Sequence, residues 1–206
     1  MSTVAAVPGN LWRLRTVAAV VAVTGAGVGF NLLRLQLRLD RGPYLASVVA
    51  FLAFGVLALG AARAASLTRG ELALNPPRWG PLAVGGTLSA AVMIGMAWAT
   101  APVTRIAGPS QLIGGLVLFG LCTAPAEELM FRGVLYALVE RQWGSVTAII
   151  VSAVGFAAVH IPVYGLGSLP VAVAAGLLLG WLRWWCNSLA GPWAVHTLAD
   201  LSLLWL

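Results

Sequence analysis

The stretch CTAPAEELMFRGVLYALVERQWG, residues 122–144, places two adjacent glutamates inside a long apolar segment. The surrounding chain has 206 residues, of which 60% are hydrophobic and 9% charged, and its mean hydropathy is +0.94. This composition lies outside the usual range of soluble globular domains and is typical of an integral membrane protein. Two neighbouring acids in such a chain therefore need a structural or a functional explanation.

Apolar runs long enough to cross a bilayer core of about 30 Å as helices follow one another along the chain. Arginines and connections rich in Pro and Gly separate these runs. We expect an all-α polytopic membrane protein whose residues 1–206 form a single bundle of about seven transmembrane helices, within a range of about six to eight. The expected spans are about 16–33, 44–62, 80–101, 111–139, 145–161, 168–184 and 188–206.

The N-terminal apolar run is preceded by Arg13 and Arg15, as in a signal peptide, but further arginines follow it and no small-residue cleavage site stands out. A retained first membrane helix is the better interpretation. With seven spans, one side of the membrane would carry Arg13, Arg15, Arg63, Arg69, Arg78, Arg141 and Arg183, and the other Arg34, Arg38, Arg41 and Arg105. This distribution favours a cytoplasmic N-terminus. The absence of lysine hints at a GC-rich bacterial genome, hence a bacterial cytoplasmic membrane.

The net charge of +6 does not indicate a nucleic-acid partner, because the arginines are scattered singly between apolar runs. Membrane lipid is the partner that they suit. Cys122 and Cys186 lie in or beside apolar runs and form neither a disulfide framework nor a metal-ligand pair, so both are interpreted as packing residues. The sequence gives no indication of an oligomeric state.

Five acids and histidines fall within the predicted spans, namely Glu127, Glu128, His160, His196 and Asp200. An ionisable side chain near the bilayer centre costs roughly 2.5 to 3.5 kcal/mol on insertion scales, so such residues usually face the bundle interior or a watery cavity. These five come from three different spans, and the chain has no other histidine. Their concentration predicts one polar functional site.

The two glutamates have different surroundings on their helix. Glu128 lies four residues before Arg132, which is the favourable order for an ion pair on one face, and a structural salt bridge is its simplest interpretation. Glu127 points about 100° away and lacks a local partner. Because a low-dielectric surrounding disfavours a bare charge, such a carboxylate suits a general base, although hydrogen bonding to another helix is the plain alternative.

The histidines supply the other half of the expected chemistry. Phe156 and His160 share one helix face, and His196 and Asp200 share another. At ~1.5 Å per residue, Glu127 and His160 lie at similar depths on either side of a turn near residues 141–144. His196 is only about eight residues into its span, so a tilted helix or a different turn position is needed to bring it level. A base with nearby donors makes amide hydrolysis by water plausible.

Three motifs in order carry a family resemblance: EELMFR at Glu127–Arg132, FAAVH at Phe156–His160 and HTLAD at His196–Asp200. They are similar to the patterns EExxxR, FxxxH and HxxxN. Together they resemble the CAAX protease and bacteriocin-processing family, also called the Abi family, of glutamate-type intramembrane endopeptidases related to the type II CAAX prenyl endopeptidases. The resemblance extends over residues 122–200.

The resemblance implies roles for individual residues. Glu127 and His160 would activate the attacking water, His196 and Asp200 would lie at the oxyanion, and Glu128, Arg132 and Phe156 would support the site. It implies no metal and no cofactor, and a protein or peptide substrate that is lipid-modified or embedded in the membrane. Asp200 departs from the pattern, which has Asn there. An ionised Asp200 would repel an oxyanion, so it is either protonated or orients His196 and favours its imidazolium form.

Two other functions remain open at this point. Glu127, His160 and His196 match the two-histidine, one-carboxylate ligand set of many catalytic zinc sites, although the chain contains no HExxH motif. Alternatively, the protein is a non-enzymatic immunity factor, or a transporter in which the buried acids relay protons.

Overall fold

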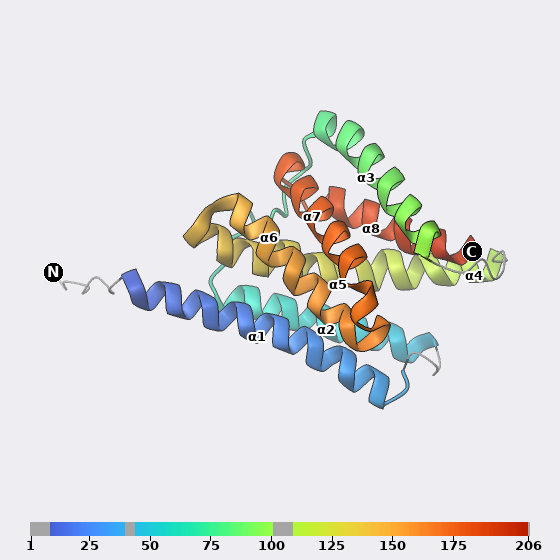
Figure 1. Cartoon of the computed structure of the whole chain (residues 1–206), viewed down its shortest axis with the longest axis horizontal. Coiled ribbons are helices and arrows are strands. Elements are labelled where there is room, and N and C mark those ends of the chain that lie inside the picture. Colours follow the sequence, from blue (N-terminus) through green and yellow to red (C-terminus); the bar gives the residue numbers. More distant parts are fainter. Residues whose placement is uncertain (1–8, 40–43, 101–108, 206) are drawn as a thin grey trace.

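The computed structural model describes residues 9–39, 44–100 and 109–205, and within these ranges it contains helices and no strand (Figure 1). The separate long helices are α1 (Gly9–Gln36), α2 (Tyr44–Ala64), α3 (Trp79–Thr100), α7 (Leu169–Cys186) and α8 (Ala190–Ser202). Short 3₁₀ turns at Leu166–Ser168 and Leu203–Trp205 precede α7 and follow α8. The predicted all-α membrane fold is confirmed.

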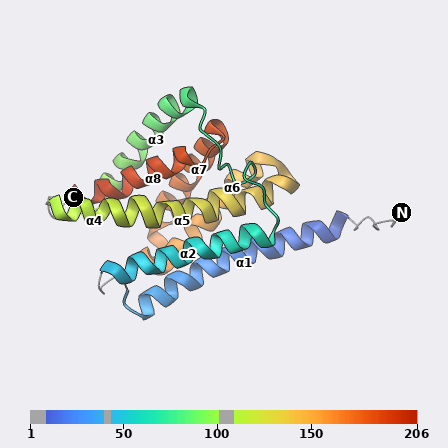
Figure 2. The same cartoon turned by 180° about the vertical axis from the view of Figure 1, so that it is seen from behind.

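Between α3 and α7 the chain forms a long composite rod that then folds back. The rod is built from α4 (Pro109–Gly115), a π-helix (Leu116–Thr123), α5 (Ala124–Glu128), a second π-helix (Leu129–Leu135) and the start of α6 (Tyr136–Tyr164). It runs through the middle of the molecule, with α1 and α2 on one side and α3 and α8 on the other (Figures 1 and 2). The rod therefore contacts the elements that carry the candidate site.

The predicted turn near residues 141–144 lies at Gly144, which has φ +78° and breaks α6 into two arms. The 53-residue segment Leu112–Tyr164 accordingly makes two passes, and four other stretches in the described chain are long and apolar enough to cross a membrane. The last predicted span is shorter than expected, because α8 has 13 residues and is about 20 Å long. Six long passes plus α8 fall within the predicted range. The predicted span ends at Ala101 and Leu206, together with Arg41 and Arg105, lie outside the described residues.

The first π-helix has a clear cause in the sequence. Pro125 has no N–H and its ring disfavours regular α-helix before it. The Ala124 N–H donates to the Phe119 carbonyl five residues back, which is the π spacing. In that register the Gly120 carbonyl would need the missing N–H of Pro125, and it instead accepts a hydrogen bond of 2.7 Å from the Trp193 indole of α8. The proline thus joins the rod to α8 immediately before the two glutamates.

The connection between α2 and α3 is a folded cap, although the sequence predicts only a polar link. Within this cap, which comprises residues 65–78, Leu72 and Ala73 are buried. The cap receives the turn between α7 and α8, since the Leu189 N–H donates to the Ala73 carbonyl at 2.9 Å and Ser188 Oγ donates to the Asn75 carbonyl at 2.6 Å. Ser188 is 1% exposed, so α8 begins beneath the cap. The turn between α7 and α8 therefore lies inside the bundle, and this position allows His196 to lie level with the other site residues.

Arg141 fastens the cap to the rod. Its guanidinium donates to the Ala65 and Ser66 carbonyls, each at 3.1 Å, and to both carboxylate oxygens of Glu71. The hydrogen bond from Arg141, followed by a backbone hydrogen bond from Thr68, lowers the pKa of the Glu71 carboxyl from its ordinary 4.5 to about 2. The cap is therefore held by Arg141, and the ion pair that Arg141 forms with Glu71 is lost when the Glu71 carboxyl is protonated in acid.

The closest helix crossing lies between α6 and α7. A Cβ atom built on Gly176 would lie 2.7 Å from the Ala153 Cα and 3.1 Å from the Ala153 carbonyl oxygen, so backbone meets backbone there. A second close contact lies between α1 and α6, where a Cβ on Gly27 would lie 2.7 Å from the side-chain atom Val159 Cγ1. Small residues allow this close packing in membrane bundles.

We predict that Gly176→Ala destabilises the protein by about 1–3 kcal/mol, because rigid backbone cannot yield to the added methyl group. Thermal unfolding in detergent micelles measures the loss. Gly95→Ala in α3 is the matched control, since a Cβ there meets nothing within 4 Å, and it should not lower the melting temperature. An unchanged melting temperature for Gly176→Ala would mean that α6 and α7 can separate at this point.

We predict that the stability contributed by the Glu71–Arg141 pair depends on pH. Because the folded-state pKa of Glu71 is depressed, the contribution is complete above pH 4.5 and disappears as the pH falls toward 2. The melting temperature of Glu71→Gln should lie below that of the wild type at pH 6, and the difference should close near pH 2. A difference that stays constant over this pH range contradicts the prediction.

Candidate active site

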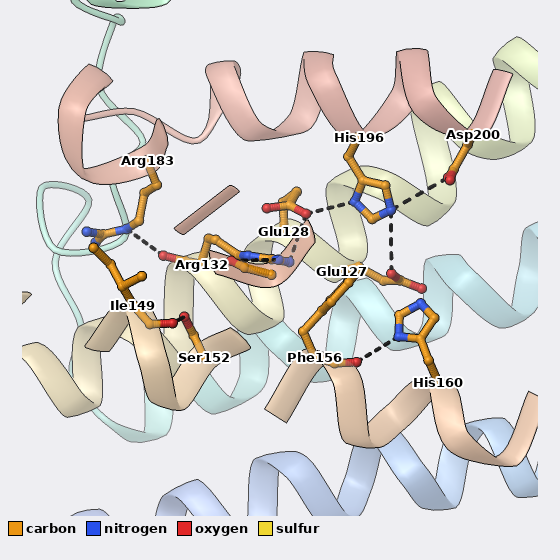
Figure 3. Close-up of polar contacts among 11 residues, drawn as sticks. Glu127, Glu128, Arg132, Ile149, Ser152, Phe156, His160, Arg183, His196 and Asp200 are labelled. Carbon is orange, nitrogen blue, oxygen red and sulfur yellow. Dashed lines mark hydrogen bonds and ion pairs between the residues drawn. The ribbon is translucent and has the colours of Figure 1, made fainter. Parts of the chain in front are cut away.

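Three elements bring the predicted site residues together. Glu127 and Glu128 come from α5, between the two π-helices, His160 comes from the second arm of α6, and His196 and Asp200 come from α8 (Figure 3). Glu127, Glu128 and His196 are 8%, 1% and 5% exposed, respectively. The side chains expected to share one polar site do so in the structure.

Glu128 is the anchor of the site. Its Oε1 accepts a hydrogen bond from Arg132 Nη1 at 3.0 Å, which is the predicted i,i+4 ion pair, and another from His196 Nδ1 at 2.7 Å. Arg132 is fully buried; its Nη2 reaches the Gly176 carbonyl at 3.5 Å, and its guanidinium lies 4.2 Å from the Phe156 ring centroid. One carboxylate oxygen therefore links α5 to α8, and its arginine extends the link to α7.

The bond to Glu128 fixes the orientation of the His196 ring. With Nδ1 donating to Glu128, Nε2 faces the two other acids, at 3.9 Å from Glu127 Oε2 and 3.7 Å from Asp200 Oδ2 (Figure 3). Both separations are too long for a direct hydrogen bond. A water or a substrate oxygen placed among these three groups would lie within reach of all of them.

The His160 ring is oriented by its own helix. Its Nδ1 lies 2.7 Å from the Phe156 carbonyl oxygen, and because a carbonyl oxygen only accepts, Nδ1 carries the proton of this bond. Nε2 of the neutral ring therefore keeps a lone pair. The ring packs between Phe156, at 4.4 Å between centroids, and Tyr164, at 5.8 Å. Figure 3 shows the free edge of the ring beside Glu127.

Phe156 is an apolar side chain that packs against three other residues of the site. Its ring contacts His160 on one side and His196 on another, at 5.7 Å between centroids, and Arg132 lies over its face. Phe156, which was predicted to support the site, therefore lies among three of its side chains.

Two cavities meet at these residues. One, of about 270 Å³, is lined by Glu127, His160, His196 and Asp200 together with Asn31 and Arg34 of α1. The other, of about 460 Å³, shares His160, His196 and Asp200 but continues along apolar side chains of α3 that include Met93 and Met96. Glu127 Oε2 is buried and makes no hydrogen bond. A polar and an apolar space thus adjoin the same histidines.

Sequence reasoning missed the contribution of α1 and of the end of α6. Arg34 was interpreted only as a juxtamembrane anchor, and Tyr164, which lines both cavities, was not considered. Neither residue belongs to a motif, so only the packing of α1 against α6 reveals them. Cys122 and Cys186 are buried free thiols, in agreement with their interpretation as packing residues.

Among the residues that the structure describes, no group of three or more His, Cys, Asp or Glu side chains is arranged to hold a metal ion.

An all-α membrane bundle that places a buried carboxylate, a buried histidine and a half-buried histidine beside one cavity has the groups that a membrane-embedded hydrolase needs. Residues 109–202 match the family described as type II CAAX prenyl endopeptidase Rce1-like. The match covers the region of the three motifs and agrees with the resemblance to the CAAX protease family that they indicated. No curated protein and no solved structure matches the chain.

We predict that Arg132→Met destabilises the fold by about 3–5 kcal/mol, because it leaves the Glu128 carboxylate buried without its cation. Denaturant unfolding in micelles measures the change. The double variant Glu128→Gln/Arg132→Met removes both charges and should be more stable than the sum of the single changes implies. Additive losses would mean that the two side chains act independently.

Proposed function

We propose that the protein hydrolyses a peptide bond in a lipid-modified or membrane-embedded protein or peptide. The observation that carries the proposal is the buried carboxylate of Glu127, whose Oε2 makes no hydrogen bond and which lines a cavity together with two oriented histidines. A carboxylate without a hydrogen-bond donor is free to take a proton from water. The lone pair of His160 Nε2 in the same cavity is a second acceptor for that water.

The proposed reaction follows from these positions. Glu127 removes a proton from water while His160 orients it, and the oxygen attacks the carbonyl carbon of the substrate. His196, protonated at Nε2, donates a hydrogen bond to the oxyanion that forms. When the C–N bond breaks, Glu127 returns the proton to the departing nitrogen, leaving a carboxylate and an amine. No step requires a metal or a cofactor.

Asp200 acts in this proposal through His196. Its Oδ2 lies 3.7 Å from His196 Nε2, and a carboxylate there attracts a protonated imidazole. A direct role at the oxyanion would require a protonated Asp200, because like charges repel. Asp200 is therefore a positioning residue, and the Asn that the family pattern has at this place can hydrogen-bond to the oxyanion itself.

The second cavity suits the apolar part of a substrate. Its walls include Met93 and Met96, whose flexible thioether side chains adapt to irregular apolar groups. A lipid chain or an apolar side chain bound there would place the adjoining peptide beside His160 and His196. The description of the matching family as a prenyl endopeptidase supports this assignment.

The proposed orientation follows the arginine distribution, with the N-terminus on the cytoplasmic side of a bacterial membrane. Asn31 and Arg34 line the smaller cavity and lie near the opposite end of α1. In this orientation that cavity is displaced toward the outer face, so a substrate would reach it from that side.

We predict that Glu127→Gln lowers cleavage of a prenylated peptide by about 10²–10⁴-fold, since the amide cannot accept the proton of water. Cleavage by the purified protein in micelles is followed by mass spectrometry of the products. Glu140→Gln, in the same rod but outside both cavities, is the matched control and should cleave normally. Full activity of a folded Glu127→Gln protein would exclude the proposed base.

The same assay separates the two roles of Asp200 and the role of metal. Asp200→Asn should lower cleavage by about tenfold if the residue acts through the charge that it places beside His196, and should keep cleavage if it acts at the oxyanion, because the neutral amide still donates a hydrogen bond. Asp200→Leu should lose more activity.

Loss of wild-type cleavage on adding a chelator, with recovery on adding zinc, would instead favour the zinc protease alternative.

A further inference from the structure

The smaller cavity contains a cation that the proposed reaction does not use. Arg34, in the last turn of α1, lines it together with Glu127 and His160, and it is the only Lys or Arg among the described residues that line this cavity. Its Nε is buried and has no hydrogen-bond partner. Its guanidinium lies 5.0 Å from the centroid of the Phe51 ring.

The other arginines near the rod are engaged. Arg132 pairs with Glu128, Arg141 with Glu71, and Arg183 with the Glu140 carboxylate at 3.6 Å. Within the part of the chain that the structure describes, Arg34 forms no such ion pair, even though two carboxylates line the same cavity. A partly buried guanidinium without an anion has lost hydration without receiving a partner in exchange.

We propose that Arg34 binds a carboxylate group of the substrate peptide. This inference rests on the proposed function, because it takes the cavity to be the peptide site. The planar guanidinium presents a fork of N–H donors that matches a carboxylate, and its position against an aromatic ring holds the fork in place.

The size of the cavity limits where that carboxylate can lie in the substrate. A volume of about 270 Å³ is at the small end for ligand pockets, so only a short peptide segment fits between Arg34 and Glu127. A carboxylate held at Arg34 therefore belongs to a residue close to the scissile bond. The α-carboxylate of a nearby chain terminus and an Asp or Glu side chain share this chemistry.

Binding to the full-length Glu127→Gln protein in micelles tests the inference without requiring cleavage. The probe is a fluorescent peptide with a farnesylated cysteine three residues before its end, prepared as a free acid, as a C-terminal amide, and as an amide whose last residue is Glu. The free acid should bind about tenfold more tightly than the plain amide. In Arg34→Gln/Glu127→Gln this preference should disappear. Arg38→Gln/Glu127→Gln, altered at an exposed arginine outside both cavities, should keep it.

The outcomes are distinct. Tight binding of the Glu-ended amide, lost with Arg34→Gln, assigns the carboxylate to a side chain, and preference for the free acid alone assigns it to the terminus. Equal binding of all three probes, or no binding of any, overturns the inference even if the wild type cleaves other peptides. A loss of phosphatidylglycerol binding in Arg34→Gln, with the peptide preference intact, would assign Arg34 to a lipid headgroup and also overturn it. A carboxylate preference without cleavage by the wild type would leave Arg34 assigned and reject the hydrolase.

Discussion

The Glu128 carboxylate holds the described site together through a single oxygen. Oε1 accepts from Arg132 at 3.0 Å and from His196 at 2.7 Å, and both partners are buried. A buried charge is tolerated only when it is paired and hydrogen-bonded, so the positions of these side chains depend on one another. Because Glu128 takes both donors, the adjacent Glu127 is left without one. The two neighbouring acids thus differ, because Glu128 is held by two hydrogen bonds and Glu127 Oε2 by none.

Arg183 of α7 links the rod that carries the two glutamates to the cap between α2 and α3. The buried Arg183 donates to the Arg132 carbonyl at 2.6 Å and to the Glu71 carbonyl at 2.7 Å, and its guanidinium lies 3.5 Å from the Tyr136 ring centroid. One side chain of α7 therefore touches both the rod that carries the glutamates and the cap that sets the depth of α8. Hydrogen bonds from Arg183 to backbone carbonyls therefore help to position the site. Such bonds depend on the fold more than on the local sequence, because every residue carries a carbonyl group.

Sequence patterns predicted the parts of this protein that obey a simple period. The apolar runs gave the spans to within a few residues for most helices, and the i,i+4 spacing of Glu128 and Arg132 gave their ion pair, because both follow from helix geometry. The π-helices were not predicted, and the first one arises from the missing N–H of Pro125 and its compensation by Trp193, which is distant in sequence. The folded cap was also not predicted, because many of its contacts are made by backbone groups that every residue carries. Arg34 was assigned to the surface because hydropathy gives depth but not the direction in which a side chain points.

The two π-helices on either side of α5 make the length of the rod a constraint in its own right. Each residue of an α-helix advances the chain by about 100° around the axis. Deleting one residue from 116–123 would shift the angular phase of everything that follows and turn the two acids toward different neighbours. Exchanging one apolar residue for another there leaves the phase intact. Over evolutionary time the rod should therefore tolerate changes of side chain while rejecting insertions and deletions, which we expect to gather in the connections between helices.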